Sequence, residues 1–177
     1  MAHLLFPTPL GSCGLAWNDA GLTAFVLPGR TGAETDAWLA RLAGSGDPAV
    51  PAETAPAWVR DLVARVQRHL AGELQDFRDV PLDASRVSPQ AWRVYQAARS
   101  VPAGRTSTYG DLAAMVDAPL GGSRAIGAFM GSNPWPLIVP CHRIVGAGGK
   151  LTGFSSPGGV RLKARLLALE GEQLIAE

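Results

Sequence analysis

The chain has 177 residues, 47% hydrophobic and 18% charged, with a mean hydropathy of +0.11, which excludes a disordered chain and suits one globular domain or two small ones. Its net charge of +1 hides an asymmetry, because residues 1–85 carry ten acidic and six basic side chains and residues 86–177 carry five acidic and ten basic. No apolar run is long enough to span a bilayer, the residues from Met1 do not have the basic-then-apolar pattern of a leader, and no paired metal-ligand spacing occurs. We therefore expect a cytoplasmic protein without membrane, metal or disulfide.

Short apolar runs begin the chain and predict an antiparallel sheet. Residues 3–6, 12–17 and 22–27 have strand-like composition, and Asn18–Gly21 between the last two is typical of a hairpin loop. A fourth apolar run, Phe77–Leu82, is a candidate for a further short strand.

Two amphipathic segments predict helices beside this sheet. Thr35–Ala43 is a short candidate, and a longer one runs from Trp58 to Leu70 and ends near Gly72. Gly44–Pro56 has the composition of a surface loop. Residues 83–88 form a plausible linker, so we place a domain boundary between residues 84 and 85.

The second half carries a run of predicted short helices. Ser88 and Pro89 start one that ends near Ser100, Thr108 caps a second at Tyr109–Val116, and Ser123 caps a third at Arg124–Gly131 after a turn at 119–122. Helix pairs of this kind occur in helix-turn-helix proteins, although most are only packing units. The charge asymmetry alone is equally compatible with chance and with a polyanion bound by the second half.

The most informative stretch is Pro136–Val145, an apolar run that ends at Pro140 and is followed by Cys141, His142 and Arg143. Proline fixes the backbone and holds the cysteine at a rigid bend. The positive charge beside Cys141 gives its thiol a reason for a lowered pKa, as in nucleophilic cysteines. The competing interpretation is a buried structural cysteine beside a surface histidine.

Four motifs in this order resemble the O6-alkylguanine-DNA alkyltransferases. They are Pro-Cys-His-Arg-Ile-Val at 140–145, Ser-Arg-Ala-Ile-Gly at 123–127, Asn-Pro at 133–134 and Leu-Leu-Ala-Leu-Glu-Gly at 166–171. The resemblance implies an α+β chain. Residues 1–84 would form a ribonuclease-H-like sheet-plus-helix domain, and residues 85–177 a mainly helical, winged-helix-like domain with a helix-turn-helix and the active site.

The family resemblance also implies the chemistry. Cys141 would accept the alkyl group once and irreversibly, His142 would be its base through a water, and Glu170 would orient His142. Tyr109 would donate a hydrogen bond to guanine N3, and Asn133 would tie the recognition helix to the active-site segment. No cofactor is implied.

The implied partner is double-stranded DNA that contains O6-alkylguanine, mainly O6-methylguanine, with O4-methylthymine as a second candidate. A monomer would bind the duplex through its minor groove with little sequence preference and flip the damaged base out of the stack. Arg124 would hold the gap in the duplex, and four small residues would let the helix approach: Gly122, Ser123, Ala125 and Gly127. The base pocket would be lined by Met130, Ile144, Phe154 and Ser155, and the loop at 154–159 would set its width.

The remaining chemistry-bearing residues receive structural interpretations. We expect Arg143 to bond nearby carbonyls or acids, Cys13 to be a buried small hydrophobe, and His3 and His69 to be surface or packing residues.

Three alternatives remain. A non-catalytic alkyltransferase-like protein would carry tryptophan in place of Cys141. A transcription regulator would have no use for a Cys-His-Glu set. A thiol hydrolase would need a direct hydrogen bond between Cys141 and His142. Neighbouring residues on an extended segment point to opposite faces, which disfavours such a bond.

Overall fold

The computed structural model describes residues 2–29, 31–43, 49–116, 122–151 and 158–172 of a mixed α/β chain. The N-terminal runs form an antiparallel sheet in the order β1 (Ala2–Thr8), β2 (Gly11–Asn18) and β3 (Gly21–Val26), as predicted. The Asn18 side chain accepts hydrogen bonds from the Ala20 and Gly21 amides and closes the expected hairpin.

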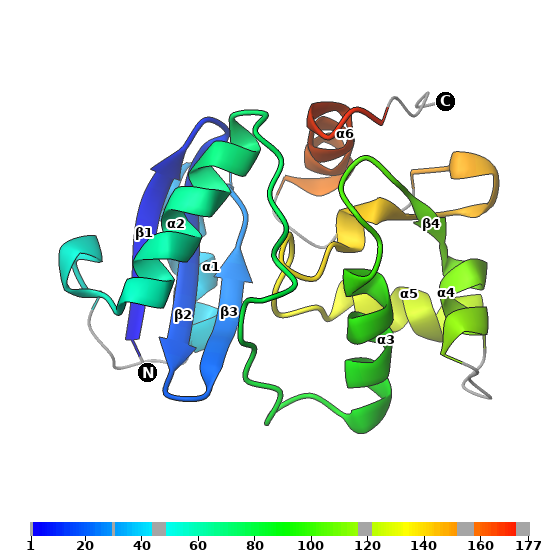
Figure 1. Ribbon diagram of the computed structural model, residues 1–177, viewed down its shortest axis with the longest axis horizontal. Helices are drawn as coiled ribbons and strands as arrows, with labels where there is room; N and C mark the ends of the chain where they lie inside the picture. The colour runs from blue at the N-terminus through cyan, green and yellow to red at the C-terminus, as the bar shows by residue number, and fades with distance from the viewer. Residues whose placement is uncertain (1, 30, 44–48, 117–121, 152–157, 173–177) are drawn as a thin grey trace.

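Helices lie on both faces of this sheet (Figure 1). The first, α1 (Gly32–Ala43), packs Leu39 against Ala16, and α2 (Ala57–Leu70), which follows the 3₁₀ helix η1 (Ala52–Thr54), packs on the other face. β2 is therefore buried almost continuously, whereas β1 alternates.

The segment after α2 corrects one prediction. Residues 77–82 are not a strand, because Phe77–Val80 turns back on itself and only Leu82 makes an isolated bridge, to Leu22. The turn buries both Phe77 and Val80, which an alternating strand could not do at this spacing. This segment runs between the sheet and the helices of the second half (Figure 1).

The second half contains α3 (Pro89–Arg99), α4 (Tyr109–Met115), α5 (Ser123–Gly131) and α6 (Gly159–Leu169), with β4 (Ser107–Thr108) paired parallel to β5 (Ile144–Val145). Ser88 and Thr108 cap their helices as predicted, at 3.1 and 3.0 Å from the Ala91 and Asp111 amides. Ser123 is not a cap. Gly122, with φ of +63°, stands in that position, and Ser123 is the first helical residue.

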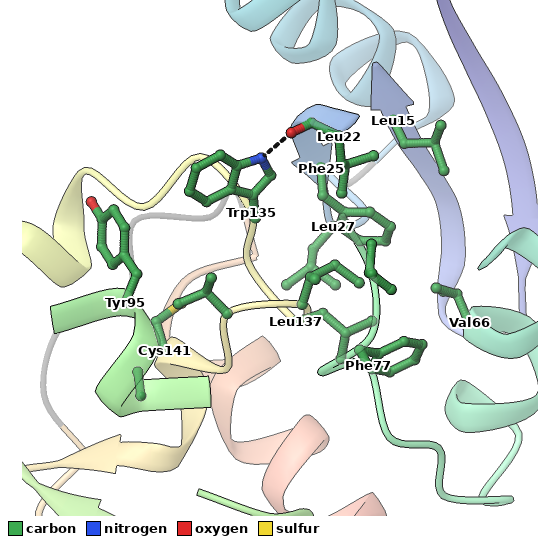
Figure 2. Packing of buried hydrophobic residues seen from close by; sticks show 14 of the residues in the cluster. Leu15, Leu22, Phe25, Leu27, Val66, Phe77, Tyr95, Trp135, Leu137 and Cys141 are labelled. Carbon is green, nitrogen blue, oxygen red and sulfur yellow. Dashed lines mark hydrogen bonds between the residues drawn. The ribbon is translucent and has the colours of Figure 1, made fainter. Parts of the chain in front are cut away.

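A single hydrophobic cluster crosses both halves of the chain (Figure 2). Trp135 lies at its centre, where its Nε1 donates to the Leu22 carbonyl oxygen at 2.8 Å and its ring meets Tyr95 edge-on at 6.0 Å. The boundary at residue 84 stays a prediction, and it would divide two units that share one core. No helix in the described ranges is long and apolar enough to cross a membrane.

Candidate active site

Cys141 lies at a tight bend, as the prolines predicted, but the run before it is not strand-like. Pro140 has φ of −79° and ψ of 67°, and the Cys141 amide donates to the Val139 carbonyl at 2.7 Å, which is an inverse γ-turn. Cys141 then begins the 3₁₀ helix η2 (Cys141–Arg143). Leu137, with φ of +76°, turns the backbone between Pro136 and Val139, so the segment cannot extend.

Asn133 fastens this bend to the end of α5. Its Nδ2 donates to the Val139 carbonyl at 2.9 Å, and its Oδ1 accepts from the Trp135 amide at 2.9 Å. The side chain therefore ties the helix to the active-site segment, as expected, and it also closes a turn at Pro134.

The Cys141 thiol is buried, and this overturns the expectation of a lowered pKa. Burial raises the pKa of Cys141, and hydrogen bonding from Asn133 and the charge of Lys163 offset that rise only in part. Arg143 does not help, because its guanidinium turns to Glu170. At neutral pH the residue is therefore a thiol that needs a base.

The neighbouring His142 has the orientation and the protonation state that a base requires. Its Nε2 lies 2.6 Å from Glu170 Oε1, and both side chains are fully buried. A carboxylate only accepts, so Nε2 carries the proton and Nδ1 presents a lone pair. Nδ1 has no hydrogen-bond partner among the described residues. Burial lowers the pKa of His142 although the Glu170 carboxylate opposes this, so the ring is neutral.

Glu170 directly follows α6 and is buried, with 4% of its surface exposed, although it lies at a helix end. Arg143 donates to its two oxygens from Nε and Nη2 at 2.8 and 3.0 Å, and His69 Nε2 lies 3.2 Å from Oε1. Burial alone would raise the pKa of Glu170, but the hydrogen bonds from His142, His69 and Arg143 hold it well below its usual range. Arg143 also donates to the Val101 carbonyl, which confirms its structural role.

Sequence reasoning missed two residues of this centre, His69 and Lys163. Of the two roles predicted for His69, surface is wrong and packing is confirmed, because the side chain is buried against Phe77. The contact with Glu170 was not predicted, although His69 lies seven residues after Leu62 on the apolar face of α2. Lys163 interrupts the apolar face of α6 in the same way, and it is 1% exposed with Nζ 2.7 Å from the Ile144 carbonyl oxygen. Burial lowers the pKa of Lys163, opposed by the charge on Cys141.

Tyr109 is brought near this centre by the pairing of Thr108 with Val145 across β4 and β5. Its half-buried ring lies 5.8 Å from Lys163 Nζ. The tyrosine and the cysteine segment are therefore held side by side by backbone hydrogen bonds.

The start of α5 presents the residues expected to meet DNA. Ser123 and Arg124 are exposed and Ala125 is half-buried, while a Cβ atom on Gly122 or Gly127 would meet nothing within 4 Å. Of the expected pocket residues, Met130 and Ile144 are buried, and Phe154 and Ser155 lie outside the described residues. In the described ranges, no cluster of His, Cys, Asp or Glu could hold a metal ion.

Comparisons with known proteins show what the chain as a whole is similar to. Residues 89–172 match the family model for the DNA-binding domain of 6-O-methylguanine DNA methyltransferase. A curated methylated-DNA–protein-cysteine methyltransferase from Methanosarcina acetivorans is 34% identical over 97% of this chain and 99% of its own length. One from Mycolicibacterium paratuberculosis is 45% identical over 61% of this chain, and the alignment spans only 62% of that relative.

Two further relatives bear on DNA. A DNA base-flipping protein from Thermus thermophilus is 46% identical over 60% of this chain and 69% of its own length. The crystal structure of Mycobacterium tuberculosis OGT in complex with DNA superposes with a TM-score of 0.74 at 33% identity, over 97% of this chain and 93% of that one.

Proposed function

The chain belongs to the family of methylated-DNA–protein-cysteine methyltransferases, and from this premise we propose that it repairs O6-alkylguanine in DNA by moving the alkyl group to the sulfur of Cys141. One observation carries the assignment of Cys141. The adjacent His142 is hydrogen-bonded through Nε2 to Glu170 at 2.6 Å. The ring is therefore neutral, and its Nδ1 lone pair can accept a proton.

The reaction is a displacement at the alkyl carbon. The thiol proton passes through a water to His142 Nδ1, and the Cys141 sulfur forms a bond to the carbon as the bond from carbon to O6 breaks. The electron pair of the broken bond stays on O6, and the proton held by His142 neutralises the departing guanine. The thioether has no route back, so each protein acts once.

Three other side chains assist this displacement. Tyr109 donates to guanine N3 and so disperses the negative charge that develops on the base. Lys163 places a positive charge near Cys141 while the sulfur is anionic. Asn133 holds the bend in register with α5.

The base reaches Cys141 by rotating out of the duplex, and α5 enters the minor groove to achieve this. The exposed Arg124 fills the gap, and the open space beside Gly122 and Gly127 lets the helix approach closely. The protein acts on duplex DNA as a monomer in the cytoplasm with little sequence preference. The finer fold assignment is part of the same proposal, with a ribonuclease-H-like unit in residues 1–84 and a winged-helix-like unit in residues 85–177.

Intact-protein mass spectrometry after mixing with a duplex that holds one O6-methylguanine tests the transfer. We expect a gain of one methyl group, located on the Cys141 peptide, and Cys141→Ser should abolish it while leaving binding of the lesion duplex intact. Cys13→Ser is the matched control, because Cys13 is buried in the sheet with its pKa raised to about 12 by burial, and it should transfer normally.

A wild-type chain that binds the lesion and stays unmodified would be a base-flipping protein without transferase activity. More than one guanine restored per protein would contradict the single-use mechanism.

A further inference from the structure

We propose that His69, which comes from the N-terminal half of the chain, is a positioning residue for the transfer reaction. It acts through Glu170, whose orientation it fixes and which in turn holds His142. The inference rests on the proposed function, since it assigns a role in the same reaction.

The helix α2 delivers His69 to the centre. The residue lies in the last turn of α2 with its side chain fully buried, and its ring packs on Phe77 at 5.3 Å. Figure 1 shows that α2 ends at the same edge of the molecule as α6, the helix that Glu170 follows. The contact joins residues 101 positions apart in sequence.

The backbone of the segment after α2 sets the tautomer of His69. The Gln75 amide donates to Nδ1 at 3.0 Å, so Nδ1 is the acceptor and the ring proton is on Nε2. Nε2 therefore donates to Glu170 Oε1 at 3.2 Å. The ring cannot turn over without losing both hydrogen bonds inside the core.

The consequence lies in the hydrogen-bond capacity of Glu170. A carboxylate offers about four acceptor positions. Glu170 receives four hydrogen bonds, one each from His69 and His142 and two from Arg143. With His69 present the carboxylate has one orientation, and it holds the His142 ring with Nδ1 as the free acceptor. Without His69, Oε1 has one donor fewer and Glu170 can rotate toward Arg143.

Three variants separate positioning from stability. His69→Leu removes the donor, and His69→Gln keeps an N–H donor at the reach of Nε2. Val66→Ala, one turn earlier on the same buried face of α2, loosens the packing without touching Glu170. Single-turnover transfer is measured over a range of lesion-duplex concentrations, which gives the rate constant at saturation and the Kd separately, beside a thermal melt.

We expect His69→Leu to lower the saturating rate constant by about tenfold or more with Kd unchanged, as partners that orient an active group do. His69→Gln should restore most of the rate. Val66→Ala should lower the melting temperature and leave the rate constant unchanged.

Wild-type rates in His69→Leu, or equal losses in the Leu and Gln variants, would overturn the inference. If His69→Leu does not fold, His69→Asn replaces it, because its shorter amide falls short of Glu170. Wild-type transfer by that variant would be equally decisive. Failure of the proposed function is distinguishable, since it appears as absence of methyl transfer in the wild-type chain.

Discussion

Cys141 illustrates how much a reactive residue depends on its neighbours. Burial raises the pKa of its thiol, so the sulfur is protonated at neutral pH despite the Arg and His beside it in sequence. Arg143 is engaged by Glu170, and His142 is neutral, so neither supplies the positive charge that the sequence suggested. In the proposed mechanism the reactivity comes instead from His142, a base that is oriented by a buried carboxylate.

The buried carboxylate should make the fold sensitive to acid. The pKa of folded Glu170 lies below the ordinary value of 4.5, so as pH falls through that value the unfolded chain takes up a proton and the folded chain does not. Its contribution to the free energy of unfolding is therefore present above about pH 4.5 and lost in acid. His142 acts in the same direction below 6.5, because burial lowers its pKa.

Glu170→Gln should remove most of the loss of unfolding free energy in acid that Glu170 causes. It should also lower the free energy of unfolding at neutral pH by about 3 kcal/mol, because Arg143 is left buried without its partner. Urea denaturation of both proteins at neutral pH and at about pH 4 measures both effects. Glu53→Gln, on the exposed η1, is the control and should match the wild type. Identical acid sensitivity in wild type and Glu170→Gln would show that the Glu170 carboxylate is not its source.

Among the elements, α5 combines a buried apolar face with a face on which glycines leave open space. Ile126 and Met130 face the core, whereas the sides of Gly127 and Gly131 meet open space. Glycine inside a helix costs roughly 1 kcal/mol relative to alanine, so the fold alone gives no reason for Gly127. The proposed close approach of a DNA groove to the helix would give one.

Two substitutions at Gly127 test this interpretation. Gly127→Ala should raise the free energy of unfolding by roughly 0.5–1 kcal/mol, as measured in urea, because no atom opposes the added methyl group. Gly127→Leu should fold as well as the alanine variant but weaken binding of the lesion duplex by about tenfold, since the larger side chain obstructs the groove. Unchanged duplex affinity in Gly127→Leu would remove α5 from the interface.

At the scale of the whole molecule, the two halves of the chain differ in net charge but share one hydrophobic core. The basic excess belongs to residues 86–177, which include α5, and the acidic excess to residues 1–85. The two parts nevertheless pack through Trp135 and Leu22 and meet again at His69 and Glu170 (Figure 2 shows the first of these contacts). We therefore expect the acidic half to support the site without adding to the attraction for DNA.

The charge division predicts a local salt effect. Duplex affinity should fall on the order of tenfold or more between roughly 50 and 200 mM salt, as counterions are released from contacted phosphates. Arg124→Ala should reduce the slope of log K against log salt by about one, while the exposed Arg60→Ala on α2 should leave it unchanged. Fluorescence anisotropy with a labelled duplex measures the slopes. Equal slopes for the two variants would contradict a docking surface confined to the second half.

The sequence by itself determined much of the local structure and pointed to the residues that we propose to react. The strands, the caps at Ser88 and Thr108 and the bend at Pro140 follow from periodicity and from backbone preferences that act over a few residues. The four motifs identified the family and brought Cys141, His142 and Glu170 together in one hypothesis. These features are encoded within short windows, so a single chain is enough to predict them.

Only the tertiary structure decided the state of those residues. Whether Cys141 is a thiol depends on how completely it is buried, and whether Arg143 acts on the sulfur or on Glu170 depends on a contact 27 residues away. His69 reaches Glu170 across 101 residues, and its place on a helix face suggested only packing. Desolvation and long-range hydrogen bonds arise when distant elements pack, and no local pattern specifies which elements meet.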